Sequence, residues 1–345
     1  MTSDTIRASA PLRISFVGGG TDFPHYYERH GGAVLSATID HAAHVSVAPR
    51  DDRQVRIRSL DLGHLVGYHL EHGPVYDGVM DLPKAAIERM GVPTGIDVDI
   101  GSDAPPGSGL GGSSALVTAC VGALAMLTDR SMAPREVAEL AYLIERKDLG
   151  IAGGWQDQFA AAFGGFNLIE FDQRGVAVRP LALSPEAIGE LRSHLLLCYT
   201  GRVRTDLGLI ATQIRMYEDG REDTIVGMKQ LQAMAFEMRR ELEDGNLDRL
   251  GPMLREAFES KKLMNPRVSE GTPVERLLAV AADAGASGGK ICGAGGGGYL
   301  LLACRPDRQP AVRTALEALG GRFAEFAFRG HGVEAHAGGR VWRPS

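Results

Sequence analysis

The chain has 345 residues, of which 44% are hydrophobic and 23% charged, and 37 basic against 43 acidic side chains give a net charge of −6. These proportions are those of an ordinary folded protein and exclude disorder or fibrous structure for the chain as a whole. The acidic balance excludes the basic excess that a nucleic-acid-binding surface needs, so we expect no nucleic-acid partner.

A membrane-spanning or secreted protein is not expected either. The longest nearly apolar stretch, residues 115–127, is shorter than the ~20 residues of a membrane span. No apolar core separates Arg7 from Arg13, so no signal peptide is visible. The four cysteines lie far apart, mostly in apolar segments, without the CxxC spacing of a zinc site. We therefore expect buried thiols in a reducing cytoplasm.

The first half of the chain predicts a mixture of strands and helices. Helices are expected at 112–127 and, after Pro134, at 135–146. Apolar runs and alternating patterns indicate strands at 12–17, 33–39, 44–47, 54–57, 96–100, 166–171 and 177–181.

The second half predicts more helix, with a domain boundary near residue 190. A strand is expected at 194–199, and the chain closes with a strand, a helix and a strand around its last glycine cluster. Helices are expected at 206–217, 223–242, 248–263 and 274–284.

Glycine is nearly twice as frequent as usual, with 45 of 345 residues or about 13% against ~7%. The glycines cluster in loops at 18–20, 107–112 and 293–298, each after a strand-like segment. The second loop matches GxGxxG between a strand and a helix, as in a Rossmann unit. That unit needs a second parallel strand after the helix, whereas a second helix is expected here. A Walker A loop is excluded as well, because Ile291 follows Lys290 where Ser or Thr is required.

The second glycine loop has two physical interpretations. Its backbone N–H groups and the positive end of the following helix would cradle phosphates, with the hydroxyls of Ser113 and Ser114 in reach of a phosphate or its Mg²⁺. Alternatively, the glycines only form a tight turn and Ser113 only caps the helix. The loop by itself leaves both open.

Three separated motifs can be read together. They are Pro-Leu-Arg-Ile-Ser-Phe-Val-Gly-Gly-Gly-Thr-Asp at 11–22, Pro-Pro-Gly-Ser-Gly-Leu-Gly-Gly-Ser-Ser-Ala at 105–115, and Lys-Ile-Cys-Gly-Ala-Gly-Gly-Gly-Gly-Tyr at 290–299. In this order they resemble the GHMP kinases, the superfamily of galactokinase, homoserine kinase, mevalonate kinase and phosphomevalonate kinase. The first motif, with segments 26–35, 199–201 and 261–266, resembles the D-glycero-D-manno-heptose 7-phosphate kinase branch, to which the fucokinase domain is similar.

The resemblance implies an α+β, two-domain GHMP kinase fold. A ribosomal-protein-like βαβ domain (1–192) would precede a ferredoxin-like domain (193–345), with the active site in the cleft between them. The implied reaction is the ATP- and Mg²⁺-dependent phosphorylation of the anomeric hydroxyl of a sugar, in the first place D-glycero-D-manno-heptose 7-phosphate, giving the 1,7-bisphosphate.

Other functions stay open. The alternative acceptors are a free sugar such as fucose and another higher-sugar phosphate. A non-catalytic sugar and nucleotide sensor is a different class, against which the joint presence of Arg13, Ser113, Glu145 and Asp157 argues. The expected partner is a small-molecule sugar or sugar phosphate, and the chain is expected to be a monomer or a homodimer.

The resemblance also implies roles for single residues. Asp157 would be the catalytic base and Arg13 the cation facing it, whereas a helix N-terminal acid and a strand-surface charge are the structural alternatives. Ser113 and Glu145 would hold Mg²⁺, and the alternative for Glu145 is an ion pair with Arg146 or Lys147 on an exposed face. The nucleotide phosphates would contact Pro106, Gly107, Ser108, Gly109, Leu110, Gly111, Gly112, Ser113 and Ser114.

The acceptor is expected at residues from five segments. A carboxylate such as that of Asp22 can accept two sugar hydroxyls, although a loop aspartate also forms turns. Arg202, Arg204, Lys261 and Lys262 would hold the acceptor's own phosphate, and the alternative is that they are solvated surface charges. The expected contacts are Gly19, Gly20, Thr21, Asp22, Gly154, Asp157, Arg202, Arg204, Lys262, Gly296 and Gly297.

Overall fold

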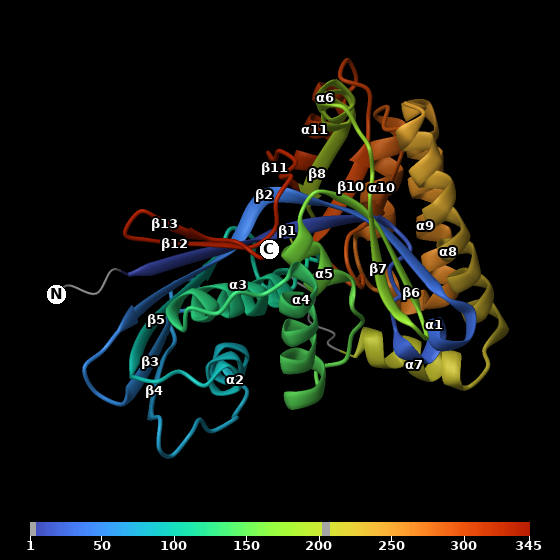
Figure 1. The fold of residues 1–345 in the computed structure, drawn as a ribbon. Coiled ribbons are helices and arrows are strands. Elements are labelled where there is room, and N and C mark those ends of the chain that lie inside the picture. Colours follow the sequence, from blue (N-terminus) through green and yellow to red (C-terminus); the bar gives the residue numbers. More distant parts are fainter. Residues whose placement is uncertain (1–4, 202–207) are drawn as a thin grey trace.

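The computed structural model describes residues 5–201 and 208–345, and two sheets organise this part of the chain (Figure 1). The larger sheet has the order β13-β12-β1-β2-β5-β3-β4, and β6 and β7 extend it beside β2. Its strands are β1 (Ile6–Val17), β2 (Gly32–Pro49), β3 (Gln54–Ser59), β4 (Leu65–His69), β5 (Ile96–Ser102), β6 (Phe166–Asp172), β7 (Gly175–Pro180), β12 (Glu334–Ala337) and β13 (Arg340–Trp342).

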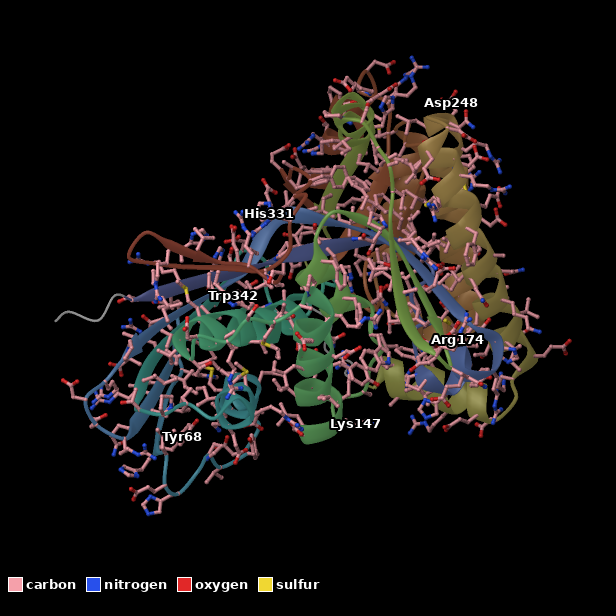
Figure 2. The ribbon with its side chains drawn as sticks, in the orientation of Figure 1. Tyr68, Lys147, Arg174, Asp248, His331 and Trp342 are labelled. Carbon is pink, nitrogen blue, oxygen red and sulfur yellow. The ribbon has the colours of Figure 1, made fainter. Side chains whose placement is uncertain are left out.

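The first half of the chain also contains helices. They are α1 (Pro24–His30), α2 (Asp81–Met90), α3 (Gly112–Leu127), α4 (Pro134–Tyr142), the π-helical turn η1 (Leu143–Asp148), α5 (Gln156–Phe163) and α6 (Pro185–Ser193). Of these, α3 and α5 contact β1 and β2. Helix α3 lies across β1 and β2 and is buried along most of its length, because its small side chains allow close packing. Trp342 covers its far end, where a Cβ on Gly122 would come within 3.2 Å of the indole (Figure 2).

The second sheet has the order β11-β8-β10-β9, and all its pairings are antiparallel. Its strands are β8 (Leu195–Tyr199), β9 (Gly288–Ile291), β10 (Tyr299–Ala303) and β11 (Arg322–Ala324). The accompanying helices are α7 (Leu209–Glu218), α8 (Glu222–Glu243), η2 (Leu247–Arg249), α9 (Leu250–Met264), η3 (Pro266–Val268), α10 (Val274–Asp283) and α11 (Gln309–Glu317). After β11 the chain returns to the first sheet, where β12 pairs with β1 (Figure 1).

Two expectations about local structure are wrong. The strands expected at 33–39 and 44–47 are one continuous strand, β2, because the polar residues between them find partners without a turn. The Asp40 amide donates to the carbonyl of Ala327 at 2.9 Å, and the Asp40 carboxylate accepts the Ala327 amide at 2.9 Å. The helix expected to run regularly to Arg146 changes at Leu143 into η1.

No helix in the described ranges is both long and apolar enough to cross a bilayer. The core around α3 and the larger sheet is continuous with the inner face of α8 and α9, whereas β8 to β10, α10 and α11 enclose a smaller cluster. Helices α8 and α9 stand together at one end of the molecule (Figure 1). The N-terminal part of α8 lies against the C-terminal part of α9 at Gly227, and both helices contact β1, while α9 also contacts β9.

Candidate active site

A cavity of about 1060 Å³ lies where the three glycine loops meet. The end of β1 with Gly18 to Gly20 forms one wall, and the loop 105–112 with the start of α3 forms another. The third loop contributes Gly293 to Gly295. Each loop comes from a different part of the sequence, so only the folded chain creates this space.

The loop before α3 presents backbone rather than side chains to the cavity. Helix α3 begins after Gly111, which has φ +77°, and no side chain caps its first turn. Ser113 is therefore not the cap that the structural interpretation required. Gly109 packs so closely on the third loop that a Cβ would lie 2.5 Å from the carbonyl oxygen of Cys292. Uncapped N–H groups at the positive end of a 16-residue helix suit a phosphate.

Glu145 lies in η1 directly behind this loop and is fully buried. Its Oε1 accepts the hydroxyl of Ser113 at 2.7 Å and its Oε2 the hydroxyl of Ser114 at 2.6 Å, and Gln158 Nε2 also donates to Oε2. The exposed-face alternative is wrong, because Lys147 points outward at the surface (Figure 2). Arg146 does lie 3.7 Å from Glu145, but inside the protein.

The oxygen atoms around Glu145 fit Mg²⁺. A carboxylate and a serine hydroxyl are hard ligands of the kind that Mg²⁺ prefers. Ser113 is exposed toward the cavity while Ser114 is buried, so a cation would take Ser113 and one Glu145 oxygen. The described residues contain no cluster of three or more His, Cys, Asp or Glu, so phosphates and water would complete the shell. Gln158 Oε1 is buried beside this carboxylate, and among the described residues it has no hydrogen-bond partner.

Arg13 and Asp157 face each other across the cavity floor. Nε of Arg13 donates to Oδ1 of Asp157 at 2.8 Å, and Nη2 forms an ion-pair contact with the same oxygen at 2.7 Å. Nη1 of Arg13 donates to the carbonyl of Gly109 at 2.7 Å, which ties the pair to the phosphate loop. A Cβ on Gly111 would lie 3.4 Å from both side chains. The start of α3 therefore holds any bound phosphate next to this ion pair.

The buried carboxylate of Asp22 lines the cavity beside Asp157. Its Oδ1 accepts the Gly20 amide at 3.0 Å and Nε2 of Gln156 at 3.2 Å, while its Oδ2 accepts the Gln156 amide at 3.2 Å. Burial and the neighbouring Asp157 raise the pKa of Asp22. Gly154 leaves room for this carboxylate, since a Cβ there would lie 2.0 Å from Asp22 Oδ2.

The structure brings most of the predicted contact residues to the cavity. From the first motif and the segment before α5 they are Arg13, Gly19, Gly20, Asp22, Gly154 and Asp157, and from the metal pair Ser113 and Glu145. From the phosphate loop they are Pro106, Gly107, Ser108, Gly109, Gly111, Gly112, Ser113 and Ser114. Leu110 is an exception, because its side chain is packed in the core and its carbonyl accepts the Arg13 amide at 3.0 Å.

Four predicted acceptor contacts do not line the cavity. The Thr21 hydroxyl is used internally, because its oxygen lies 2.8 Å from the carbonyl oxygen of Gly18 and 3.0 Å from that of Ala33, either of which can accept its single hydrogen. Lys262 turns outward, where it forms an ion pair with Glu259 at 2.9 Å. Gly296 and Gly297 stand beyond the part of the third loop that reaches the cavity. The predictions for Arg202 and Arg204 lie outside the described residues.

Gln156 and Lys290 are functional candidates that were not predicted, and Lys261 was expected only as one of four basic residues that would hold the acceptor's phosphate. Lys261 is buried, and its Nζ donates to the carbonyl of Gly293 at 2.6 Å. Lys290 is buried as well, and its Nζ donates to the carbonyl of Ser15 at 2.8 Å. Burial, reinforced by nearby cations, lowers the pKa of Lys261 to about 7, and burial also lowers the pKa of Lys290.

A signal for Lys261 was present in the helical pattern. Positions three, four and seven residues away on the same helix face are apolar, and all are buried: Leu254, Ala257, Phe258 and Met264. This periodicity places Lys261, and not Lys262, on the inward face. Gln156 carries no comparable signal, because its role depends on Asp22, 134 residues earlier.

The comparisons with known proteins agree with this geometry. Family models described as GHMP kinases N terminal domain and GHMP kinases C terminal match residues 79–165 and 238–321. The D-glycero-alpha-D-manno-heptose 7-phosphate kinase of Campylobacter jejuni is 34% identical over 340 residues, which cover 96% of this chain and 98% of that protein.

Solved structures show the same relationship. A D-glycero-D-manno-heptose 1-phosphate kinase from Bacteroides thetaiotaomicron is 31% identical, with a TM-score of 0.80 over 96% of this chain and 98% of that one. A galactokinase from Lactococcus lactis, solved with galactose, shares the fold at 22% identity, with a TM-score of 0.79 over 96% and 95% of the two chains. The predicted two-domain architecture is thereby confirmed, and the chain belongs to the GHMP kinase family.

Proposed function

We propose that this kinase transfers the γ-phosphoryl group of ATP to the anomeric hydroxyl of D-glycero-D-manno-heptose 7-phosphate, giving the 1,7-bisphosphate. The observation that carries the proposal is the contact of Arg13 with Asp157 directly under the phosphate loop. The similarity to a heptose 7-phosphate kinase along nearly all of both chains supports the choice of acceptor.

The acceptor hydroxyl would bind between Asp157 and Asp22. Both guanidinium contacts of Arg13 go to Oδ1 of Asp157, and Oδ2 has no donor among the described residues. Oδ2 would therefore accept the proton of the attacking hydroxyl, and Arg13 would offset the charge that develops on the transferred group. Oδ2 of Asp22 and the free Oε1 of Gln156 provide further acceptors for sugar hydroxyls.

The phosphates of ATP would lie on the loop 105–112 at the start of α3. Backbone N–H groups would orient them in line with the acceptor hydroxyl, since phosphoryl transfer depends mostly on positioning and charge neutralisation. Ser113 and Glu145 would hold Mg²⁺, which when bound neutralises phosphate charge. We place the reaction in the cytoplasm, because the described cysteines are all buried and free, as a reducing compartment favours.

An acceptor screen tests the proposal. ADP release would be followed with heptose 7-phosphate, the free heptose and L-fucose, and phosphorus NMR would identify an anomeric phosphate in the product. We expect the 7-phosphate to exceed the free sugars in kcat/KM by roughly 10²–10⁴, the worth of two charge-assisted hydrogen bonds. L-fucose is the pertinent rival, since fucokinases of Arabidopsis thaliana and Bacteroides fragilis are each 28% identical to this chain. Equal or faster turnover of a free sugar contradicts the proposal.

A further inference from the structure

Lys261 lines the cavity, but it has no role in the reaction proposed above. It lies on α9, and its amine reaches the third glycine loop at Gly293. A Cβ on Gly293 would lie 2.6 Å from the Cα of Gly109, so this is the point where the third loop meets the phosphate loop. Lys290 approaches from β9 and contacts the carbonyl of Ser15, two residues along β1 from Arg13.

The two lysines make an electrostatic arrangement that is unfavourable without a ligand. Within the described ranges, neither amine has a carboxylate within ion-pair distance, and each has one carbonyl as its hydrogen-bond partner. An ammonium group has three donors, so two remain on each. A buried charge without a counter-ion destabilises the fold. The carboxylate nearest to Arg13, that of Asp157, is already paired with it.

A purely structural role does not require this arrangement. Bracing a single carbonyl needs only a neutral donor, which a buried amide side chain supplies without desolvating a charge. Lys261 and Lys290 instead join Arg13 on the wall of one cavity, and only the Arg13 charge is paired. The Asp22 carboxylate, which also lines the cavity, offsets part of this positive charge, and a bound anion would offset the rest. Both substrates of the proposed reaction carry such an anion.

We infer that Lys261, supported by Lys290, is an additional binding residue for a dianionic phosphate held beside Arg13 and Asp157. The inference rests on the proposed function for the source of the phosphate, which is either the group being transferred from ATP or the acceptor's own phosphate. It replaces Lys262, which lies outside the cavity, as the lysine of α9 that meets substrate.

Binding measurements separate the two sources. Inorganic phosphate, ADP, a non-hydrolysable ATP analogue and heptose 7-phosphate are titrated into wild type and Lys261→Met, with exposed Lys229→Met as the control for loss of one charge. We expect Lys261→Met to bind inorganic phosphate at least tenfold more weakly and Lys229→Met to bind it as wild type does. If the ATP analogue loses affinity and ADP does not, Lys261 holds the transferred group. If heptose 7-phosphate loses affinity, it holds the acceptor's phosphate.

Proton uptake gives a second readout that a structural lysine would not change. The titratable groups that face Lys261 are Arg13, Asp22, Lys290 and the Cys292 thiol, and the net effect of burial and the neighbouring cations lowers the pKa of Lys261 to about 7. At pH 8 the amine is therefore mostly neutral, and a bound dianion should draw a proton onto it. Calorimetry in buffers of different ionisation enthalpy should show this uptake in wild type and not in Lys261→Met.

Lys261→Arg separates a binding defect from a folding defect. Arginine stays charged at every accessible pH, so this variant should bind phosphate without taking up a proton. Unchanged affinity of Lys261→Met for all four ligands overturns the inference, as does a loss in Lys262→Met that Lys261→Met does not share. Failure of wild type to phosphorylate heptose 7-phosphate overturns the proposed function instead, and the phosphate and nucleotide titrations still decide the role of Lys261.

Discussion

Two nitrogens of Arg13 converge on a single oxygen of Asp157, with Nε and Nη2 at 2.8 and 2.7 Å from Oδ1. The aspartate is thus fixed by one oxygen, and the other is left to a ligand. Since Nη1 of Arg13 also holds the carbonyl of Gly109 at 2.7 Å, the orientation of the carboxylate is tied to the phosphate loop. The pair therefore couples the two halves of the proposed reaction, the donor phosphates and the acceptor hydroxyl.

Asp157→Asn should lower kcat by roughly 10²–10⁴, the usual worth of a general base, and leave the affinities for ATP and sugar phosphate nearly unchanged. The amide keeps the shape of the side chain and cannot take up the proton. Steady-state kinetics and separate binding titrations measure the two effects. Asp172→Asn is the matched control, since Asp172 pairs with Arg174 at the surface and lies outside the cavity lining (Figure 2). Near-normal turnover of Asp157→Asn contradicts a base role.

Ser113→Ala should raise the Mg²⁺ concentration needed for half-maximal activity about tenfold. Its hydroxyl is the cavity-facing partner of Glu145, at 2.7 Å from Oε1. Ser114→Ala is the informative comparison, because its buried hydroxyl contacts the other carboxylate oxygen at 2.6 Å and supports Glu145 from behind. We expect the smaller shift in that variant. An Mg²⁺ titration of Ser113→Ala that overlays wild type would remove Ser113 from the metal site.

The sequence could predict the helices and strands that are determined by residues close together in the chain. Helix α3 is confirmed with its predicted bounds, because a glycine loop starts it and an unbroken run of small apolar residues continues it. Helix α2 was missed, since Pro83 stands inside it and the left-handed Met80 precedes it. The continuity of β2 was also missed, because the partner of Asp40 lies near Ala327, 287 residues away.

The residues of the candidate site also fall into two groups, those that a local motif identifies and those that only contacts in the folded chain place at the site. The glycine loops, Arg13 and Asp157 could be found from motifs, since each motif is a short segment with its own chemistry. The choice between Lys261 and Lys262 depended on a helical rotation of one residue, and it needed the apolar face of α9 to be considered. Thr21 illustrates the opposite error, in which a polar residue next to a site holds the backbone and not the ligand.

Gly154→Ala should raise the KM for the acceptor at least tenfold and leave the KM for ATP unchanged. The added Cβ would lie 2.0 Å from Oδ2 of Asp22 and 2.7 Å from the Asp22 carbonyl oxygen, so the Asp22 carboxylate must move. The phosphate loop is not touched by this methyl group. Gly189→Ala is the control, because nothing lies within 4 Å of a Cβ there and alanine suits the helix interior of α6. An unchanged acceptor KM would show that the position of Asp22 is unimportant for sugar binding.

Lys261 should also leave a signature in the pH dependence of stability. Its pKa is about 7 in the folded protein and ~10.4 in the unfolded chain, so between these values the unfolded state binds more protons. Stability must then rise with pH across this window, by at most ~1.4 kcal/mol per pH unit from this one group.

In Lys261→Met that contribution disappears, and all other titrating groups stay. The free energy of unfolding of wild type minus that of Lys261→Met should thus increase by about 2 kcal/mol between pH 7 and pH 9. Urea denaturation of both proteins in the absence of phosphate measures this difference, with exposed Lys229→Met as the reference that should show no such trend. A difference that stays constant with pH means that Lys261 keeps an ordinary amine pKa, and the empty cavity then carries its charge without destabilising the fold.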